Sequence, residues 1–501
     1  MSLNQINYVA YLEWEAIEFP LVLTNLEFEQ AEFKFDDDAA IKIWRDDNLQ
    51  LKGHLTGRVI DPRAVNNREF VGKGNIIRQE TVKGLDANGN KVVIRGCVFG
   101  GFQTNNYTHN ENGFLIGLDL IFDTVNIVFS NTISDRPDTT LIHFEWYLIE
   151  HINPHFWGTT LRSTDAFPKK SRIGIDESDE ENKGFVGRAF SRDFFVLELP
   201  ELKCIIAKVP GKLTTNGMDG LCLEFRGEDI AKADRDFLAD LKHFLSFLLG
   251  GRLYYMGYSK IKDWELTEAL ADGPDIPLKG RSALPPIHYN QQYDWGNFAL
   301  QANQLFPKYR ELRNQLSFNH ALDRFWIANE VPVGVNLPIL AGAMEIIAGD
   351  YLKMTGNDQL EYLSKADYEA LIQEELTHLK SKLSAINGGN VILNKITGAF
   401  RKGPNEKISL FLSLLNLETG KAEKEAINLR NKMTHSKRDY TDDDVAFDDL
   451  ILTRVYQVLF NRILLKIIGY SGYYIDYSMK GCPSKPIDMK AGEIDKDTDT
   501  A

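Results

Sequence analysis

A stretch rich in glycine and proline, residues 273–286, separates two halves of the sequence that are patterned differently. Before it, short apolar runs such as residues 92–94 and 204–207 alternate with turn signals, which is typical of antiparallel strands. After it, apolar residues recur at three- and four-residue spacing over long stretches, which is typical of helices. We therefore predict an α+β multidomain chain, with a β-rich domain at 1–285 followed by an all-α helical bundle at 286–483.

Composition, turn signals and helix-capping residues refine this division. Residues 484–501 are polar and end in Asp-Thr repeats, so we expect them to be a disordered tail. The run from Asp86 to Asn90 predicts a hairpin turn centred on Asn88 and Gly89. Periodicity and capping residues predict helices at 234–249, 297–313, 317–329, 337–354, 367–383, 406–416, 421–435 and 445–468.

Charge and cysteine usage limit the classes of function. The formal net charge of −14 argues against a general polyanion binder, because non-specific binding of nucleic acid needs phosphate neutralisation. The four cysteines lie far apart without a Cys-x-x-Cys pair, which is typical of a reducing cytoplasm and provides no zinc site. The sequence has no signal peptide, membrane span, phosphate-binding loop or His-Glu-x-x-His motif. We predict a cytoplasmic protein without membrane contact, cofactor or metal.

The predicted helix at 421–435 ends in a cluster of polar and basic side chains. Asn431 and His435 are four residues apart and share one face, whereas Arg430 lies roughly 140° around the axis from His435. Arginine suits phosphate, histidine exchanges a proton near neutral pH, and asparagine can hold a water, a phosphate oxygen or the imidazole. Such a trio supplies what metal-free cleavage of RNA requires. The alternative is a solvated helix end whose cations complement the helix dipole.

The pattern Arg430-Asn431-x3-His435 resembles the Arg-polar-x3-His motif of the HEPN superfamily, which are ribonucleases built on small helical bundles. The layout of the chain is similar to that of ApeA-type abortive phage infection proteins, in which a β-rich region precedes a HEPN domain. This resemblance implies an endoribonuclease that leaves 2′,3′-cyclic phosphate ends. It assigns acid–base catalysis to His435, phosphate binding to Arg430 and positioning to Asn431, with Lys432, Lys437 and Arg438 steering the RNA.

The resemblance also implies partners. HEPN motifs work in pairs across a two-fold axis, so we expect a homodimer or a higher even oligomer that acts on RNA, with tRNA as the first candidate. The β-rich domain would sense infection or restrain the enzyme, and the trigger from the phage is unspecified. Glu345, within the apolar helix at 337–354, either faces solvent or holds Arg430 across the bundle.

Two other readings stay open. The HEPN module could be catalytically silent and bind RNA or a partner protein as a scaffold. Alternatively, the β-rich domain could bind a carbohydrate or another ligand while the helices dimerise.

Overall fold

The computed structural model describes sixteen segments of the chain: residues 17–29, 35–59, 80–99, 108–110, 113–130, 141–149, 160–161, 190–191, 194–209, 219–262, 265–274, 284–287, 297–332, 334–357, 361–435 and 443–492. Their contacts form two compact units. The first, which is β-rich, is drawn from residues 1–238, 251–283 and 289–303, and the second, which is mainly helical, from residues 239–250, 284–288 and 304–501. A β-rich N-terminal region followed by a helical C-terminal region is the architecture predicted from the sequence.

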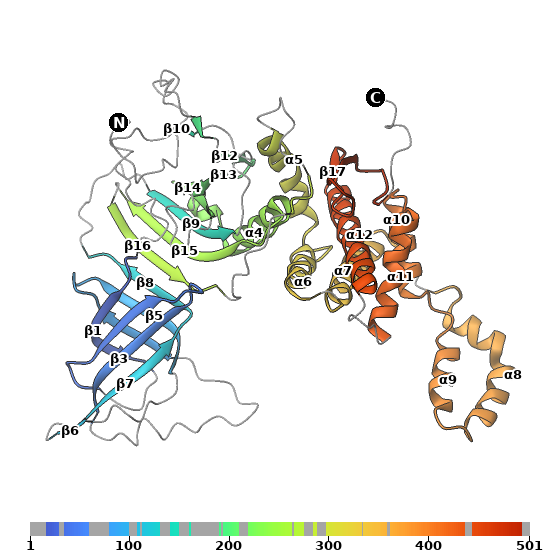
Figure 1. Cartoon of the computed structure of the whole chain (residues 1–501), viewed down its shortest axis with the longest axis horizontal. Helices are drawn as coiled ribbons and strands as arrows, with labels where there is room; N and C mark the ends of the chain where they lie inside the picture. The colour runs from blue at the N-terminus through green and yellow to red at the C-terminus, as the bar shows by residue number, and fades with distance from the viewer. Residues whose placement is uncertain are drawn as a thin grey trace. The chain divides into compact units, whose positions relative to one another are not determined.

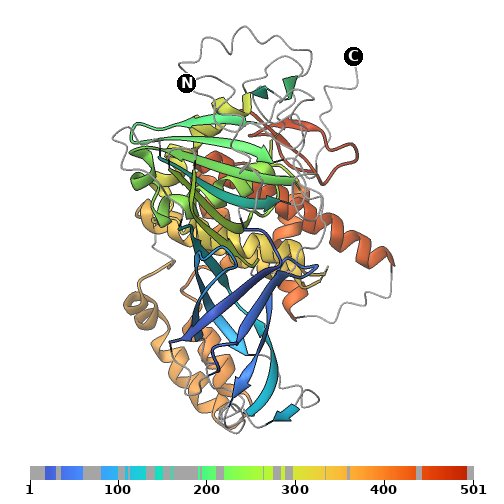
Figure 2. The same cartoon turned by 90° about the vertical axis from the view of Figure 1, so that its left-hand side faces the viewer.

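Six strands of the first unit close into a ring (Figure 2). Their order around the ring is β5-β4-β1-β2-β3-β7, and β7 pairs back with β5 through Val98 and Phe99. All pairings in the ring are antiparallel, and β6 extends the edge of β7. The strands are β1 (Leu21–Phe28), β2 (Ala40–Arg45), β3 (Leu51–Val59), β4 (Glu80–Leu85), β5 (Lys91–Phe99), β6 (Thr108–Asn110) and β7 (Gly113–Ile121).

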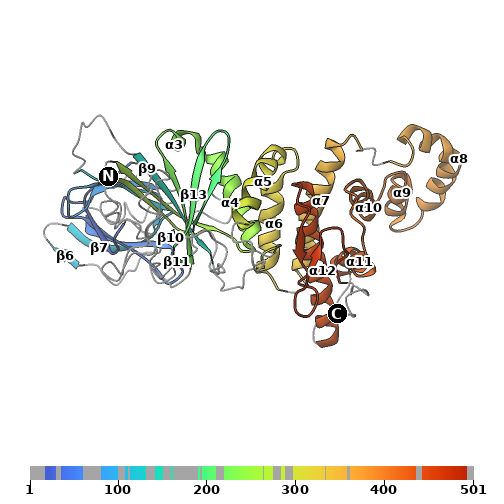
Figure 3. The same cartoon turned by 90° about the horizontal axis from the view of Figure 1, so that it is seen from above.

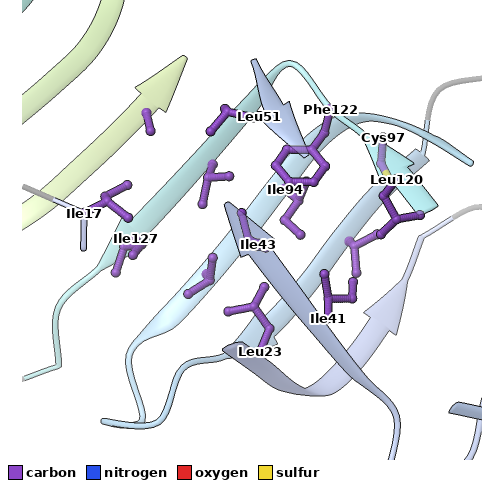
Figure 4. Packing of buried hydrophobic residues seen from close by; sticks show 14 of the residues in the cluster. Ile17, Leu23, Ile41, Ile43, Leu51, Ile94, Cys97, Leu120, Phe122 and Ile127 are labelled. Carbon is purple, nitrogen blue, oxygen red and sulfur yellow. The ribbon is translucent and has the colours of Figure 1, made fainter. Parts of the chain in front are cut away.

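The ring forms because alternate residues of each strand are apolar and point to one side. Leu23, Ile41, Ile94 and Leu120 are fully or almost fully buried in this interior, and Phe122 fills it from the end of β7 (Figure 4). Burial of such apolar side chains is the main source of stability for a closed sheet.

The hairpin predicted between β4 and β5 is present, but its turn is shifted by one residue. The Gly89 amide donates to the Asp86 carbonyl (3.0 Å), so Ala87 and Asn88 occupy the centre of the turn. Gly89 follows with φ +77°, a conformation that glycine adopts without strain. The Asp86 carboxylate accepts the amides of Asn88 and Asn90, which stabilises this turn over the one centred on Asn88 and Gly89.

The sheet continues from β8, which pairs with β5, into an open antiparallel part in the order β8-β16-β15-β9-β14-β13-β12 (Figure 1). Its strands are β8 (Thr124–Val128), β9 (Leu141–Ile149), β12 (Phe194–Glu198), β13 (Lys203–Val209), β14 (Asp219–Arg226), β15 (Tyr254–Lys262) and β16 (Glu265–Asp272). A separate pair of short strands is formed by β10 (Thr160–Leu161) and β11 (Phe190–Ser191), and a short helix, α3 (Asp229–Lys232), follows β14.

The longer helices in the described part of the chain match the predicted ones closely, with one addition. They are α4 (Arg235–Leu249), α5 (Asn297–Leu312), α6 (Phe318–Glu330), α7 (Asn336–Met354), α8 (Lys365–Leu383), α9 (Gly389–Thr397), α10 (Pro404–Leu414), α11 (Lys421–His435) and α12 (Asp443–Ile467). The sequence did not predict α9. None of the described helices combines the length and hydropathy that a membrane span requires.

The two compact units divide the chain differently from the expected boundary at residue 285, on both sides of it. Residues 239–250 belong with the helices, because Phe244 packs against Phe306 and Tyr309 with ring centroids 5.1 and 5.5 Å apart. In the other direction, the start of α5 belongs with the strands, because Phe298 packs on Phe195 at 5.1 Å. Aromatic contacts between segments far apart in sequence therefore decide the division, and the Gly/Pro-rich stretch does not.

The expected disordered tail is also wrong for its first nine residues. β17 (Tyr473–Ile475) pairs with β18 (Ser484–Pro486), and Ile487 and Ala491 are buried. The rest of the expected tail, residues 493–501, lies outside the described part of the chain. We call residues 473–492 the C-terminal strap.

Candidate functional site

The candidate site lies on α11, which covers the whole predicted helix from Lys421 to His435. The helix begins with a side-chain contact, because the Glu423 carboxylate accepts the amide of Gly420 (2.8 Å) just before the first turn. The acidic side chain near the N-terminus also complements the positive end of the helix dipole. The local sequence thus fixes where α11 starts and, through its length, where Arg430 lies.

Arg430 is held by α7. Its Nη2 atom lies 2.6 Å from Oε1 of Glu345, and the Arg430 side chain is only 9% exposed, whereas that of Glu345 is 45% exposed. The sequence left two positions open for Glu345, and the structure combines them: the carboxylate is partly in solvent and also binds Arg430. A charge-assisted contact at this distance ties the guanidinium of Arg430 to α7.

Tyr456 of α12 completes the surroundings of Arg430. Its side chain is fully buried, and burial raises the pKa of the phenol. The positive charge of Arg430 opposes this rise and the negative charge of Glu345 adds to it, which places the phenol within the field of the ion pair. The sequence analysis missed Tyr456, since an aromatic residue on an apolar helix gives no signal beyond core packing.

The structure describes the other predicted site residues only in part. The backbone of Asn431, Lys432 and His435 belongs to the last turns of α11, and their side chains are outside the described part. Lys437 and Arg438 lie outside the described residues altogether. Arg430 and Glu345 are therefore the predicted pair that the structure brings together.

The other end of α11 is anchored by a second ion pair that the sequence analysis missed. Arg462 of α12 donates through Nη1 to Glu423, and both side chains are completely buried. The Arg462 Nε atom also donates to the Ile487 carbonyl (3.1 Å), and the guanidinium lies over the ring of Tyr474 at 5.2 Å. A signal for Glu423 was present in its position three residues after Gly420, which suits a helix start.

The C-terminal strap contributes directly to this anchor. The amide of Ala491 donates to Glu423 (3.3 Å), and within the strap Lys485 lies 2.8 Å from Asp476. Burial alone raises the pKa of Asp476, but hydrogen bonds from Lys485, Ser478 and the Gly492 amide outweigh it, so the pKa is lowered. α11 is consequently held at its start by the strap and α12, and near its end by α7. Figure 3 shows α7, α11 and α12 from above.

Among the described residues, no group of three His, Cys, Asp or Glu side chains is arranged to hold a metal ion. Cys97, Cys204 and Cys222 are buried, and burial raises the pKa of the Cys204 and Cys222 thiols well above the usual value. These two thiols are therefore protonated near neutral pH and unsuited to nucleophilic attack.

Comparison with known proteins leaves the function to be argued from the site. No family model matches this chain, and neither a curated protein nor a solved structure matches it.

Proposed function

We propose that the protein is a HEPN-type endoribonuclease that cuts RNA without a metal ion and acts in abortive infection against phage. The observation that carries the proposal is the oriented guanidinium of Arg430, which Glu345 binds at 2.6 Å, five residues before His435 on the same helix. A β-rich region before a helical one also agrees with the layout on which the resemblance to ApeA-type proteins rests.

The proposed reaction needs one base, one acid and one cation. His435 of one copy takes the proton of the ribose 2′-hydroxyl, and the 2′-oxygen attacks the adjacent phosphorus. Protonated His435 of the second copy gives its proton to the departing 5′-oxygen. Arg430 stabilises the charge that builds up on the phosphorane oxygens, while Asn431 positions the phosphate. The products are a 2′,3′-cyclic phosphate and a free 5′-hydroxyl.

Glu345 supports this role because it keeps the guanidinium of Arg430 in one orientation before RNA arrives. Preorganised cations stabilise a transition state without a reorganisation cost during the reaction. The 45% exposure of Glu345 places the ion pair next to solvent, where a phosphate can approach. Lys432, Lys437 and Arg438 would add a local basic patch that steers RNA to an otherwise acidic protein.

The proposal is tested by incubating purified protein with RNA, including tRNA, in the presence of EDTA. We expect cuts that end in 2′,3′-cyclic phosphate, their loss in His435→Ala and Arg430→Ala, and no cleavage of a 2′-deoxy substrate. His320→Ala is the matched control, because His320 is an exposed histidine on α6. RNA ends sequenced from phage-infected cells carrying the same variants then identify the substrate in the cell. Equal cleavage by wild type and His435→Ala would refute the assignment.

A second candidate function is favoured by the burial of Arg430. A guanidinium that is 9% exposed and ion-paired can serve simply to fasten α11 to α7, in a HEPN module that binds RNA or a protein without cutting. In that case His435→Ala leaves the RNA ends in infected cells unchanged, and it also leaves phage protection unchanged. Loss of protection in a folded His435→Ala variant excludes this reading.

A further inference from the structure

The hairpin formed by α8 and α9 leaves most of α8 uncovered. Residues Tyr368, Ile372, Leu376, Leu379 and Leu383 lie at helical spacing and are half-buried on the side of α9. The base of the hairpin is closed by a bridge between Glu361 and Arg401, and the Tyr368 hydroxyl donates to the Ile396 carbonyl (2.6 Å). Figure 1 shows the two helices side by side. Even so, none of the nineteen residues of α8 is fully buried.

A second stripe of α8 is exposed and has an ordered pattern. Leu371, Glu375, His378 and Lys382 of α8 follow one another at intervals of four, three and four residues, and Ile386 comes four residues later in the turn just beyond the helix; all five are exposed. Leu371 is 68% and Ile386 54% exposed, which is unusual for large aliphatic side chains. Intervals of three and four residues place side chains on one face, as in helices that pack side by side.

The order of residue types along the stripe is the same from either end, except that the two charges exchange places. From either end it runs from an aliphatic residue to a charged one, then to His378 at the centre, then to the opposite charge and a second aliphatic residue. Among the described residues no ion pair is formed by Glu375 or Lys382, although Lys365 and Glu369 on the same helix do pair (3.6 Å). The chain thus leaves one acid and one base, two turns apart, available on an exposed aliphatic stripe.

We propose that this stripe binds the same stripe of a second copy of the chain, with the two α8 helices antiparallel. Reversal places Glu375 opposite Lys382 and His378 near the two-fold axis, and it brings Leu371 of each helix toward the turn of the other copy that carries Ile386. Because the contact is isologous, each aliphatic pair and each ion pair occurs twice. The charge complementarity selects a second copy over an unrelated partner, since the pattern complements its own reverse.

This interface carries no residue of the Arg430 motif, so it is separate from the pairing proposed for catalysis. Its presence would join copies through α8 whether or not the ribonuclease proposal holds. If both contacts form, the assembly is an even oligomer larger than a dimer.

The test is the mass of the full chain in solution, measured by light scattering or sedimentation at low salt. Glu375→Lys and Lys382→Glu each place like charges opposite one another twice, so we expect each variant to have half the mass of the wild type. The double variant Glu375→Lys/Lys382→Glu restores complementarity and should regain the wild-type mass. Lys380→Glu is the matched control, because Lys380 lies roughly 200° around the helix from Lys382.

A mass that both single variants leave unchanged would overturn the proposal, and so would a loss that the double variant does not restore. Cross-linking provides an independent measurement in a Cys482→Ser background, where the remaining three cysteines are buried. His378→Cys near the axis should form a disulfide-linked pair on addition of an oxidant, and Gln373→Cys on another face should not. Equal cross-linking of the two variants would count against the antiparallel register.

Discussion

Arg430 of α11 and Glu345 of α7 form an ion pair of 2.6 Å in which the cation is buried and the anion is half in solvent. This difference in burial matters because a buried charge such as that of Arg430 destabilises the fold when it has no counter-charge. Glu345 can be changed without opening a cavity, whereas the charge it neutralises stays inside the bundle. The pair therefore offers a direct test of how α11 is held.

We expect Glu345→Gln to lower the free energy of unfolding by about 1 kcal/mol, because solvent screening at Glu345 limits the strength of the pair. If the ribonuclease proposal is right, the variant also loses cleavage, since the guanidinium is no longer oriented. The measurement is denaturant unfolding together with the RNA assay. Glu374→Gln, an exposed acid on α8, is the control and should leave both quantities unchanged.

Changes to the fully buried pair of Arg462 and Glu423 should destabilise the protein more than Glu345→Gln does. Glu423→Gln or Arg462→Met alone leaves a buried charge uncompensated, so we expect each to cost about 3–5 kcal/mol. Replacing both residues together removes both charges, so the double variant should lose far less free energy of unfolding than the two single variants lose in sum. Unfolding midpoints of the two single variants and the double variant measure this coupling. Additive losses would show that the two side chains do not depend on each other.

Acid should weaken the C-terminal strap. Because the pKa of Asp476 is lowered in the folded protein, its pair with Lys485 stabilises the fold at neutral pH. That contribution is lost as the pH falls through the folded-state pKa of Asp476, below the usual carboxyl range. Stability measured from neutral pH down to about pH 3 should therefore fall less steeply in Asp476→Asn than in the wild type. Parallel curves would contradict this origin of the acid sensitivity.

Two glycines allow the cost of backbone strain to be measured separately from the cost of a steric clash. Gly250 and Gly356 have nearly the same backbone angle (φ +69° and +68°), but a Cβ at Gly250 would lie 2.1 Å from the carbonyl carbon of Leu284, whereas one at Gly356 meets nothing within 4 Å. We expect Gly356→Ala to cost about 1–2 kcal/mol from left-handed strain alone, and Gly250→Ala to cost clearly more. Unfolding experiments on the two variants decide this, and equal losses would mean that the 284–287 segment moves aside without cost.

Local patterns were sufficient to predict most of the helices. α4 begins where Asp234 predicted it, with the Asp234 carboxylate accepting the amide of Phe237 (2.8 Å), and α11 has the predicted bounds. Caps, helix-forming residues and apolar spacing act over a few residues and can be read from the sequence directly. α9 escaped prediction because the glycines at 388 and 389 read as a turn, whereas Gly388 is the N-cap of the helix and Gly389 is its first residue.

Contacts between distant segments could not be read in this way. Glu423 carries a signal for a helix start, but no local signal predicts that it pairs with Arg462, and both side chains contact strap residues more than twenty positions further along the chain. The closure of the strand ring, through Val98 and Phe99 at the end of β5, likewise depends on pairing that no local signal encodes. For the site, the sequence provided the candidate pair Arg430 and Glu345 but not Tyr456.

The C-terminal strap sets the order in which the motif helix can be completed during protein synthesis. Residues 421–435 leave the ribosome before residues 484–492, which supply the contacts to Arg462 and Glu423 at the start of α11. A growing chain, or one broken off before residue 484, therefore contains Arg430 and His435 on a helix that lacks its anchor. If the protein cuts RNA as proposed, we expect chains that end before residue 484 to be inactive, because their motif helix lacks this anchor.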